Sequence, residues 1–168
     1  MSADGHLPER LATPADIEAC RAAIRVGSRT FHAASHLLPM RVREPALALY
    51  AFCREADDAI DGSDEPRAAL RILEDRLDRA YRREPIDNAA DRALADVVAR
   101  FQIPRAVPVA LLEGFAWDAE GRIYPDLSSL RAYGMRVAGT VGVMMSLLMG
   151  VRSPGALARP ADLGVGMQ

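Results

Sequence analysis

The chain has 168 residues, of which half are hydrophobic and 5% are aromatic, and its net charge is −2. This charge gives no general attraction to nucleic acid, so we expect no nucleic-acid partner. All 21 basic residues are arginine, which excludes a lysine Schiff base or a lysine general base. The length suits one domain with a real hydrophobic core.

Alanine, leucine and valine dominate, without long β-branched alternation, and this predicts an all-α domain. Cys20 and Cys53 fit no metal-ligand spacing, and no apolar signal segment opens the chain. We therefore expect reduced thiols and a cytoplasmic location. The longest uncharged run, residues 137–151, is shorter than the ~18 residues of a membrane span. Peripheral contact with a membrane surface stays open, as does the oligomeric state.

The N-terminal region divides into a tail and a first helix. We expect residues 1–13 to form a flexible tail and residues 14–168 to belong to a single domain. Thr13 and Pro14 are typical of a helix N-cap and of the first helical position, so a helix is predicted over 14–26.

A short segment rich in hydrogen-bond donors follows this helix. It consists of Gly27, Ser28, Arg29, Thr30 and Phe31. Backbone N–H groups, two hydroxyls and a guanidinium together could hold a phosphate. The alternative is an ordinary turn between two helices, which the residues considered alone favour.

The helix predicted over 44–61 carries a stripe of ionisable side chains. These are Tyr50, Arg54, Asp57 and Asp61, at positions i, i+4, i+7 and i+11. At about 100° per residue they lie within roughly 60° of one another. An apolar stripe runs beside them through Leu49, Cys53, Ala56 and Ile60. The pattern predicts a helix that lines a cavity, with two carboxylates one turn apart that could bind Mg²⁺. The alternative is a solvated acidic face.

Proline, glycine and capping residues divide the rest of the chain into further helices. The predicted spans are 66–83, 88–101 (capped by Asn88 or Asp87), 104–120, 126–149 (capped by Asp126 or Ser128) and a last helix from 154, interrupted or kinked near Pro160.

Two features of the later helices bear on a cavity. Small residues in 136–142 would let another backbone or a long ligand approach closely, although close helix packing is the usual reason for such a run. Met144, Met145 and Met149 would suit an adaptable apolar wall. Asp118 could reach the cavity or face water, and its spacing does not decide between them.

Four stretches together resemble the squalene/phytoene synthase family, in particular its bacterial members in carotenoid biosynthesis. The stretches are residues 28–31 with 34–39, 48–54 with 57–61, 133–134 with 136–142, and 161–168. They occur in the family's order with similar spacing, and they cover almost everything after residue 14.

The resemblance implies an all-α isoprenoid (terpenoid) synthase bundle, of which residues 14–168 would be the N-terminal portion. It implies head-to-head joining of two geranylgeranyl diphosphates, through a cyclopropyl diphosphate, to phytoene. It also implies Mg²⁺, with Mn²⁺ as a substitute, bound by two aspartate-rich motifs.

The resemblance assigns roles to individual residues. Asp57 and Asp61 match the metal-binding aspartates of the first motif, and Tyr50 and Arg54 match residues beside the diphosphates. The segment from Gly27 to Phe31 matches the loop that holds a substrate diphosphate, Val137 and Gly139 fall in the stretch beside the prenyl tail, and Gln168 opens the run into the second aspartate-rich motif.

The second aspartate-rich motif would follow Gln168, so we expect the 168-residue chain by itself to be inactive or weakly active. A squalene- or diapophytoene-type synthase that uses farnesyl diphosphate shares the same motifs. A catalytically silent helical protein that acts in binding or assembly is a further alternative, which the presence of Asp57 and Asp61 disfavours. A head-to-tail prenyl elongase fits the motifs least.

Overall fold

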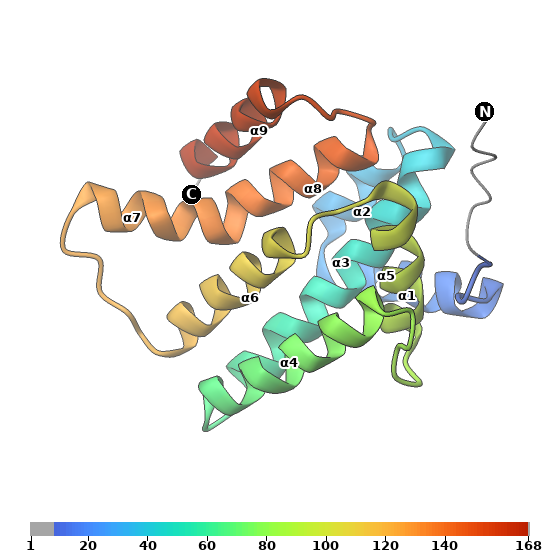
Figure 1. Ribbon diagram of the computed structural model, residues 1–168, viewed down its shortest axis with the longest axis horizontal. Coiled ribbons are helices and arrows are strands. Elements are labelled where there is room, and N and C mark those ends of the chain that lie inside the picture. The colour runs from blue at the N-terminus through green and yellow to red at the C-terminus, as the bar shows by residue number, and fades with distance from the viewer. Residues whose placement is uncertain (1–8, 168) are drawn as a thin grey trace, which may run out of the picture.

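The computed structural model describes residues 9–167 of the chain, with the side chain of Met167 left out, and this region contains helices and no strand (Figure 1). The helices are α1 (Pro14–Gly27), α2 (Arg29–Ser35), α3 (Met40–Asp61), α4 (Pro66–Tyr81), α5 (Ala89–Phe101), α6 (Ala106–Ala119), α7 (Leu127–Gly134), the π-helical η1 (Met135–Gly139), α8 (Thr140–Leu148) and α9 (Pro154–Met167). The predicted all-α fold is confirmed.

Capping side chains set where several of these helices begin. Thr13 and Asp16 form a reciprocal capping box at the start of α1. Asn88, rather than its neighbour Asp87, accepts from the first backbone N–H groups of α5. Asp126 does the same for α7, in a capping box with Ser129. These contacts satisfy N–H groups that have no partner within the helix.

Helix α3 begins four residues earlier than the sequence predicts, at Met40 instead of residue 44. Pro45 therefore lies inside the helix, where its ring removes one backbone N–H donor. The turn before α3 is held by the Arg43 guanidinium, which donates to the carbonyls of Ser35, His36 and Leu38. This contact between side chain and backbone is not visible in a hydrophobic pattern.

The single helix predicted over 126–149 is a continuous rod of three pieces, α7, η1 and α8 (Figure 1). The π-helical turn η1 widens the helix for five residues. Beyond it, α9 runs as one helix through Pro160, without the predicted interruption. Gly142 and Gly164 permit the close packing of α9 on this rod, because a Cβ on either would lie within 2.7 Å of backbone atoms of the partner helix.

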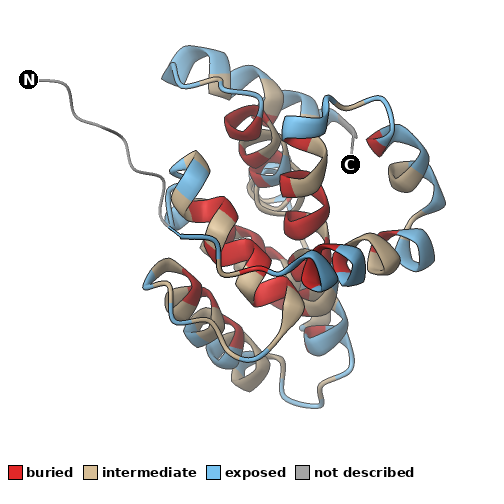
Figure 2. Ribbon diagram, turned by 90° about the vertical axis from the view of Figure 1, so that its right-hand side faces the viewer, coloured by how far each residue is buried: buried red, intermediate tan, exposed pale blue. Residues whose placement is uncertain are grey.

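The helices form two groups that meet at α6. Helices α1, α3, α4 and α5 pack together, and α9 packs on η1 and α8, while α6 contacts α3, α4, η1 and α8. The buried side chains form one cluster that is centred on α3 and α5 and extends to α6 and α8. Figure 2 shows these buried segments on the inner sides of the helices. The junction of α3, α6 and α8 is where the cavity described below lies.

Residues 9–12, predicted to be part of a loose tail, lie against α5. The N–H groups of Leu11 and Ala12 donate to the carboxylate of Asp96 at 2.9–3.0 Å, and Ala12 is buried. Residues 1–8 lie outside the described region.

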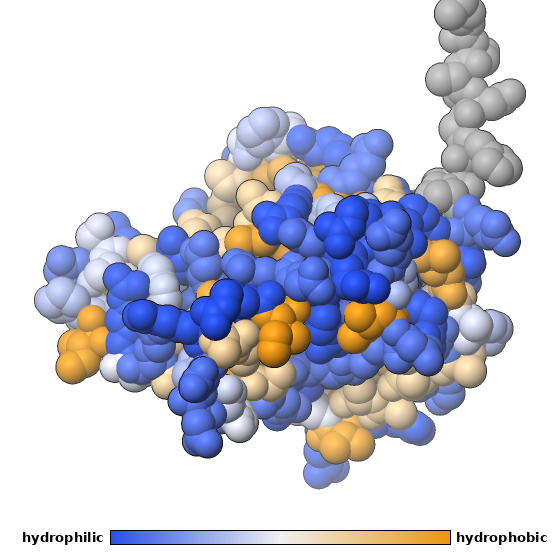
Figure 3. Space-filling view, turned by 60° about the horizontal axis from the view of Figure 1, so that its bottom comes forward, coloured by the Kyte–Doolittle hydropathy of each residue, from blue (hydrophilic) through white to orange (hydrophobic). Residues whose placement is uncertain are grey.

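The described helices include none that is both long enough and apolar enough to cross a bilayer. The face drawn in Figure 3 is largely hydrophilic, with small apolar patches that are separated from one another.

Candidate functional site

A cavity of about 340 Å³ opens between α2, α3, α6 and α8, where the resemblance places the substrate. Most of its lining is apolar, and four polar side chains stand together on its α2 and α3 side. The lining residues are Ser28, Phe31, Ala46, Leu49, Tyr50, Cys53, Arg54, Asp57, Phe115, Val141, Met144 and Met145. The cavity is therefore largely apolar and has one polar end.

Three members of the predicted ionisable stripe, Tyr50, Arg54 and Asp57, line this cavity. The neighbouring stripe is apolar as predicted, with Leu49, Ala56 and Ile60 buried and Cys53 partly buried. Arg54 lies 3.4 Å from an oxygen of Asp57 and donates two hydrogen bonds to Asp58. One guanidinium is thus shared by two carboxylates at the polar end.

Burial and the nearby carboxylate of Asp61 raise the pKa of Asp57, against the opposing effect of Arg54. Asp58 and Asp118 raise it further. A carboxylate held near others is stabilised by an added cation, because the cation offsets their mutual repulsion. The polar end is therefore suited to bind positive charge.

Asp61 is exposed, lies one turn beyond Asp57 on α3, and does not line the cavity itself. Within residues 9–167, no group of three or more potential ligands is arranged to hold a metal ion by itself. Asp57 and Asp61 carry carboxylates one turn apart on α3, which is the type of hard oxygen ligand that Mg²⁺ prefers.

Gly27 lets the hydroxyl of Tyr50 approach the backbone between α1 and α2. A Cβ at this position would lie 2.5 Å from the Tyr50 hydroxyl oxygen. On its other side the Tyr50 ring stacks on Phe31, with ring centroids 5.3 Å apart. Tyr50 is held between these two neighbours at the edge of the cavity.

The rest of the predicted diphosphate loop is divided between the cavity and the surface. Ser28 lines the cavity, and its hydroxyl accepts from the N–H of Phe31 as the N-cap of α2. Arg29 and Thr30 are exposed in the first turn of α2 and do not line the cavity. Only Ser28 lies between α1 and α2, so the segment is a helix-to-helix junction, as the alternative predicted, and two of its residues, Ser28 and Phe31, also line the cavity.

The wall that α8 provides lies further along the chain than the predicted contacts. Val137 packs on Gly114 of α6, and Gly139 packs against Ala161 of α9. Neither lines the cavity; Val141, Met144 and Met145 do. Gln168, the remaining predicted contact, lies outside the described residues.

Asp118 and two tyrosines form a polar group beside this site that the sequence did not assign. The Tyr133 hydroxyl donates to Asp118 at 2.6 Å. The Tyr124 ring lies 4.9 Å from that of Tyr133, and its buried hydroxyl has no hydrogen-bond partner within residues 9–167. Because Asp118 and Asp57 influence each other electrostatically, this group belongs to the same acidic region. The only signal in the sequence was the position of Asp118 near the end of α6.

The family model for squalene/phytoene synthase matches residues 24–168. The chain is 59% identical to phytoene synthase of Rhodobacter capsulatus over 157 residues, and 54% identical to that of Cereibacter sphaeroides over 164 residues. Each match covers 92% of this chain and 46% of the relative, so the chain spans about half the length of these proteins.

Solved structures give the same result for the fold. A dehydrosqualene synthase crystallised with ligand is 33% identical, has a TM-score of 0.81, and is matched over 92% of this chain and 54% of its own. A squalene synthase from Alicyclobacillus acidocaldarius is 28% identical with the same TM-score, over 90% of this chain and 57% of its own. On these grounds the chain belongs to the squalene/phytoene synthase family.

Proposed function

We propose that this chain carries the prenyl diphosphate site of a phytoene synthase. The enzyme would join two geranylgeranyl diphosphates head to head, through a cyclopropyl diphosphate, to give phytoene for carotenoid biosynthesis. The observation that carries the proposal is the joining of an apolar cavity to the polar end formed by Tyr50, Arg54 and Asp57. The two phytoene synthases that share more than half of its residues support it.

The polar end has the groups that a departing diphosphate requires. Diphosphate leaves only when its negative charge is stabilised, and a guanidinium can do this with two parallel hydrogen bonds. Arg54 would turn from Asp58 to the diphosphate, and Tyr50 and Ser28 would donate from their hydroxyls. Mg²⁺ held by Asp57 and Asp61 would add charge neutralisation to the same oxygens.

The apolar end suits the allylic cation that remains after diphosphate leaves. Such a cation must be kept away from water and from nucleophilic side chains. Leu49, Phe115, Val141 and Met144 line this part of the cavity with apolar side chains that carry no nucleophile. Burial raises the pKa of Cys53 to about 12, so its thiol stays neutral and adds no thiolate to the wall.

A chimera tests the proposal directly. This chain replaces the matching part of Rhodobacter capsulatus phytoene synthase, and the purified protein is incubated with geranylgeranyl diphosphate and Mg²⁺. We expect phytoene, and we expect Asp57→Asn or Asp61→Asn to lower the rate by at least about 100-fold. Asp75→Asn, an exposed change on α4, is the matched control. A folded chimera that makes no phytoene would overturn the proposal.

Chain-length preference separates this proposal from the farnesyl-using alternative, and the two similar solved structures are named as a dehydrosqualene synthase and a squalene synthase. The chimera is given C15 and C20 diphosphates in competition, and the products are separated by chromatography. Preference for the C20 substrate supports phytoene synthesis, and preference for the C15 substrate supports a squalene-type reaction. The 168-residue chain assayed alone tests whether it is weakly active by itself.

Peripheral membrane contact belongs to the same proposal, because the substrate tails and the product are hydrocarbons. Val26 and Leu37, near the two ends of α2, are 90% and 88% exposed. Apolar side chains at such turns can enter the interfacial layer of a bilayer. Co-sedimentation with vesicles, compared between the chain and a Val26→Ser, Leu37→Ser variant, tests this; equal sedimentation would contradict it.

A further inference from the structure

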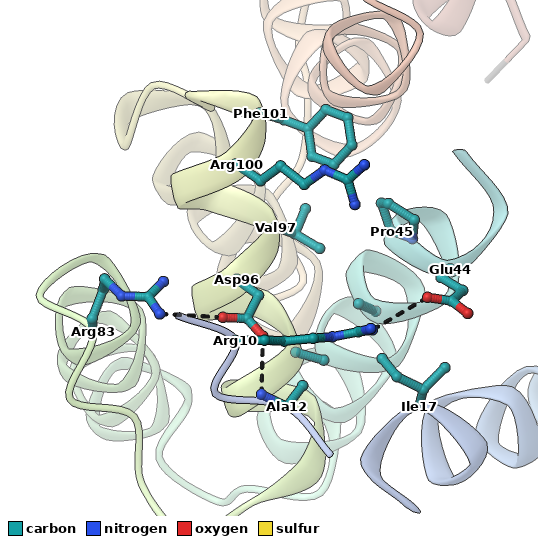
Figure 4. A pocket seen from close by; sticks show the side chains of 12 residues that line it. Arg10, Ala12, Ile17, Glu44, Pro45, Arg83, Asp96, Val97, Arg100 and Phe101 are labelled. Carbon is teal, nitrogen blue, oxygen red and sulfur yellow. Dashed lines mark hydrogen bonds and ion pairs between the residues drawn. The ribbon is translucent and has the colours of Figure 1, made fainter. Parts of the chain in front are cut away.

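Figure 4 shows a second cavity, of about 270 Å³, which shares no lining residue with the cavity described above. It is enclosed by α1, α3, α5 and the N-terminal segment 9–12. At about 100° per residue, Pro45 and Ala48 point roughly 160° away from Tyr50 and Asp57. The proposed prenyl diphosphate site therefore makes no use of this cavity.

Besides five charged residues, its lining has apolar walls that come from three helices and the N-terminal segment. They consist of Ala12, Ile17, Pro45, Ala48, Ala93, Val97 and Phe101. The volume equals about nine water molecules at ~30 Å³ each, so a hydrocarbon of roughly nine or ten carbons would fill it.

The acidic residues at the rim of the cavity are already neutralised within the protein. Glu44 pairs with Arg10 at 3.2 Å, across the mouth of the cavity (Figure 4). Asp96 accepts from the N–H groups of Leu11 and Ala12 and lies 3.4 Å from the guanidinium of Arg83. These contacts also hold the N-terminal segment in place as one wall.

Two of the basic lining residues, in contrast, have guanidinium groups whose hydrogen-bond donors are not all used. Arg100 is exposed at the rim, with its guanidinium 5.2 Å from the ring centroid of Phe101, and it forms no ion pair with any residue in 9–167. The Nη1 atom of Arg83 is buried and lacks a hydrogen-bond partner within the same residues. With three arginines and two paired acids, the lining carries one surplus positive charge.

We propose that this cavity binds a small amphiphilic monoanion, with a hydrocarbon tail of about ten carbons among the apolar walls and a carboxylate at Arg100. The apolar walls select the tail by the hydrophobic effect. The surplus guanidinium selects one negative charge, because bringing a second anionic charge to the rim would leave it without a partner. Medium-chain fatty carboxylates have this chemistry.

The experiment uses decanoate and the purified 168-residue chain with labelled methyl groups. We expect saturable shifts of the Ile17 and Val97 methyl signals in NMR spectra, and no shift of Val141, which lines the other cavity. Decanol and decyltrimethylammonium, with the same tail but no negative charge, should bind at least about tenfold more weakly. Equal binding of all three, or shifts confined to Val141, would overturn the proposal.

Two variants separate the roles of charge and volume. Arg100→Gln should weaken decanoate binding at least about tenfold, whereas Arg159→Gln, an exposed change on α9, should leave it unchanged. Val97→Phe fills the cavity and should abolish binding; if circular dichroism shows that it unfolds, Ala93→Val takes its place. Unchanged binding in the folded filling variant, or in Arg100→Gln, would contradict the proposal.

Geranyl diphosphate distinguishes a lipid carboxylate from a prenyl diphosphate as the occupant, since its tail has the same number of carbons but its head carries more charge. We expect it to shift the Ile17 and Val97 signals less than decanoate does. Tighter binding of the diphosphate at these methyl groups would overturn the monoanion assignment. Neither result depends on phytoene formation, so the two proposals can fail separately.

Discussion

Two regions of this molecule differ in how many arginine partners their carboxylates have. Between α1, α4 and α5, the buried Asp16 and Asp91 each receive two hydrogen bonds from one arginine. At the polar end of the cavity between α2, α3, α6 and α8, Asp57 and its neighbour Asp58 share the single guanidinium of Arg54. The first region holds helices together, and the second leaves negative charge unmatched.

The effect of this difference appears in how the carboxyls titrate. Hydrogen bonds from Arg92 lower the pKa of Asp16, even though burial opposes the shift. Burial and the Asp61 carboxylate raise the pKa of Asp57. A lowered pKa means that the ionised group stabilises the fold, and a raised one means that it costs stability. Carboxylates that cost stability are candidates for function.

The largest loss should come from Asp91, whose side chain is completely buried against Arg76 at 2.5 Å. Asp91→Ala leaves the guanidinium of Arg76 in a largely buried place without its main partner. Removing one member of a buried ion pair typically costs about 3–5 kcal/mol of unfolding free energy. Urea denaturation measures this loss, and a change below about 1 kcal/mol would contradict the structural role given to the first region.

Asp16→Ala should cost less, about 1–2 kcal/mol, because it removes the capping box of α1 and one partner of Arg92. The loss should also depend on pH. Since the folded-state pKa of Asp16 lies below its ordinary 3.8, its contribution is complete above about pH 5 and disappears as the pH falls through the folded-state value. The difference between the wild-type chain and the variant should therefore shrink below about pH 4. A constant difference would contradict the linkage.

Sequence patterns were sufficient for the all-α class, for the approximate spans of most of the helices and for the stripe on α3, because these depend on local periodicity and capping; they missed the short helix α2, the early start of α3 and the π-helical turn η1. The apolar face beside the stripe and the caps of α1 and α5 follow from residue types at fixed spacing. The spacing of this stripe predicted a helix that lines a cavity; Tyr50, Arg54 and Asp57 do line one, whereas Asp61 does not.

The parts that the sequence did not predict depend on contacts between distant segments. Val141 lines the cavity, whereas Val137 lies in the π-helical turn and packs on Gly114 of α6. Tyr133 reaches Asp118 across fifteen positions in the chain. The N-terminal segment is ordered through Asp96, more than eighty residues away. Periodicity within one helix contains none of this information.

In the second region, Tyr133→Phe should have a smaller effect on stability, with a loss of about 0.5–1.5 kcal/mol, the net value of one hydrogen bond. It removes the donor to Asp118 and leaves the ring packed on Tyr124. Fluorescence of Trp117, the only tryptophan and a neighbour of Tyr124, follows unfolding. In the chimera described above, we expect this variant to lower the rate of phytoene formation more than its small effect on stability would suggest. Unchanged activity would place the group formed by Asp118 and the two tyrosines outside the site.

The smallest effect on stability, and the one of opposite sign, should come from Asp57→Asn. Because its folded-state pKa is raised, ionised Asp57 costs stability at pH 7, and the wild-type chain should become more stable as the pH falls through that raised value. The side chain is about one-third exposed, so solvent screens the interaction, and we expect a gain of only a few tenths of a kcal/mol in the variant.

Magnesium with inorganic diphosphate should stabilise the wild-type chain by preferential binding to the folded state, and should stabilise the Asp57→Asn variant much less. Asp75→Asn, the exposed control on α4, should show neither the gain nor the lost response. If Asp57→Asn instead destabilised the chain as Asp16→Ala does, the carboxylates of the two regions would have the same structural role, and the case for a cation site at Asp57 would fail.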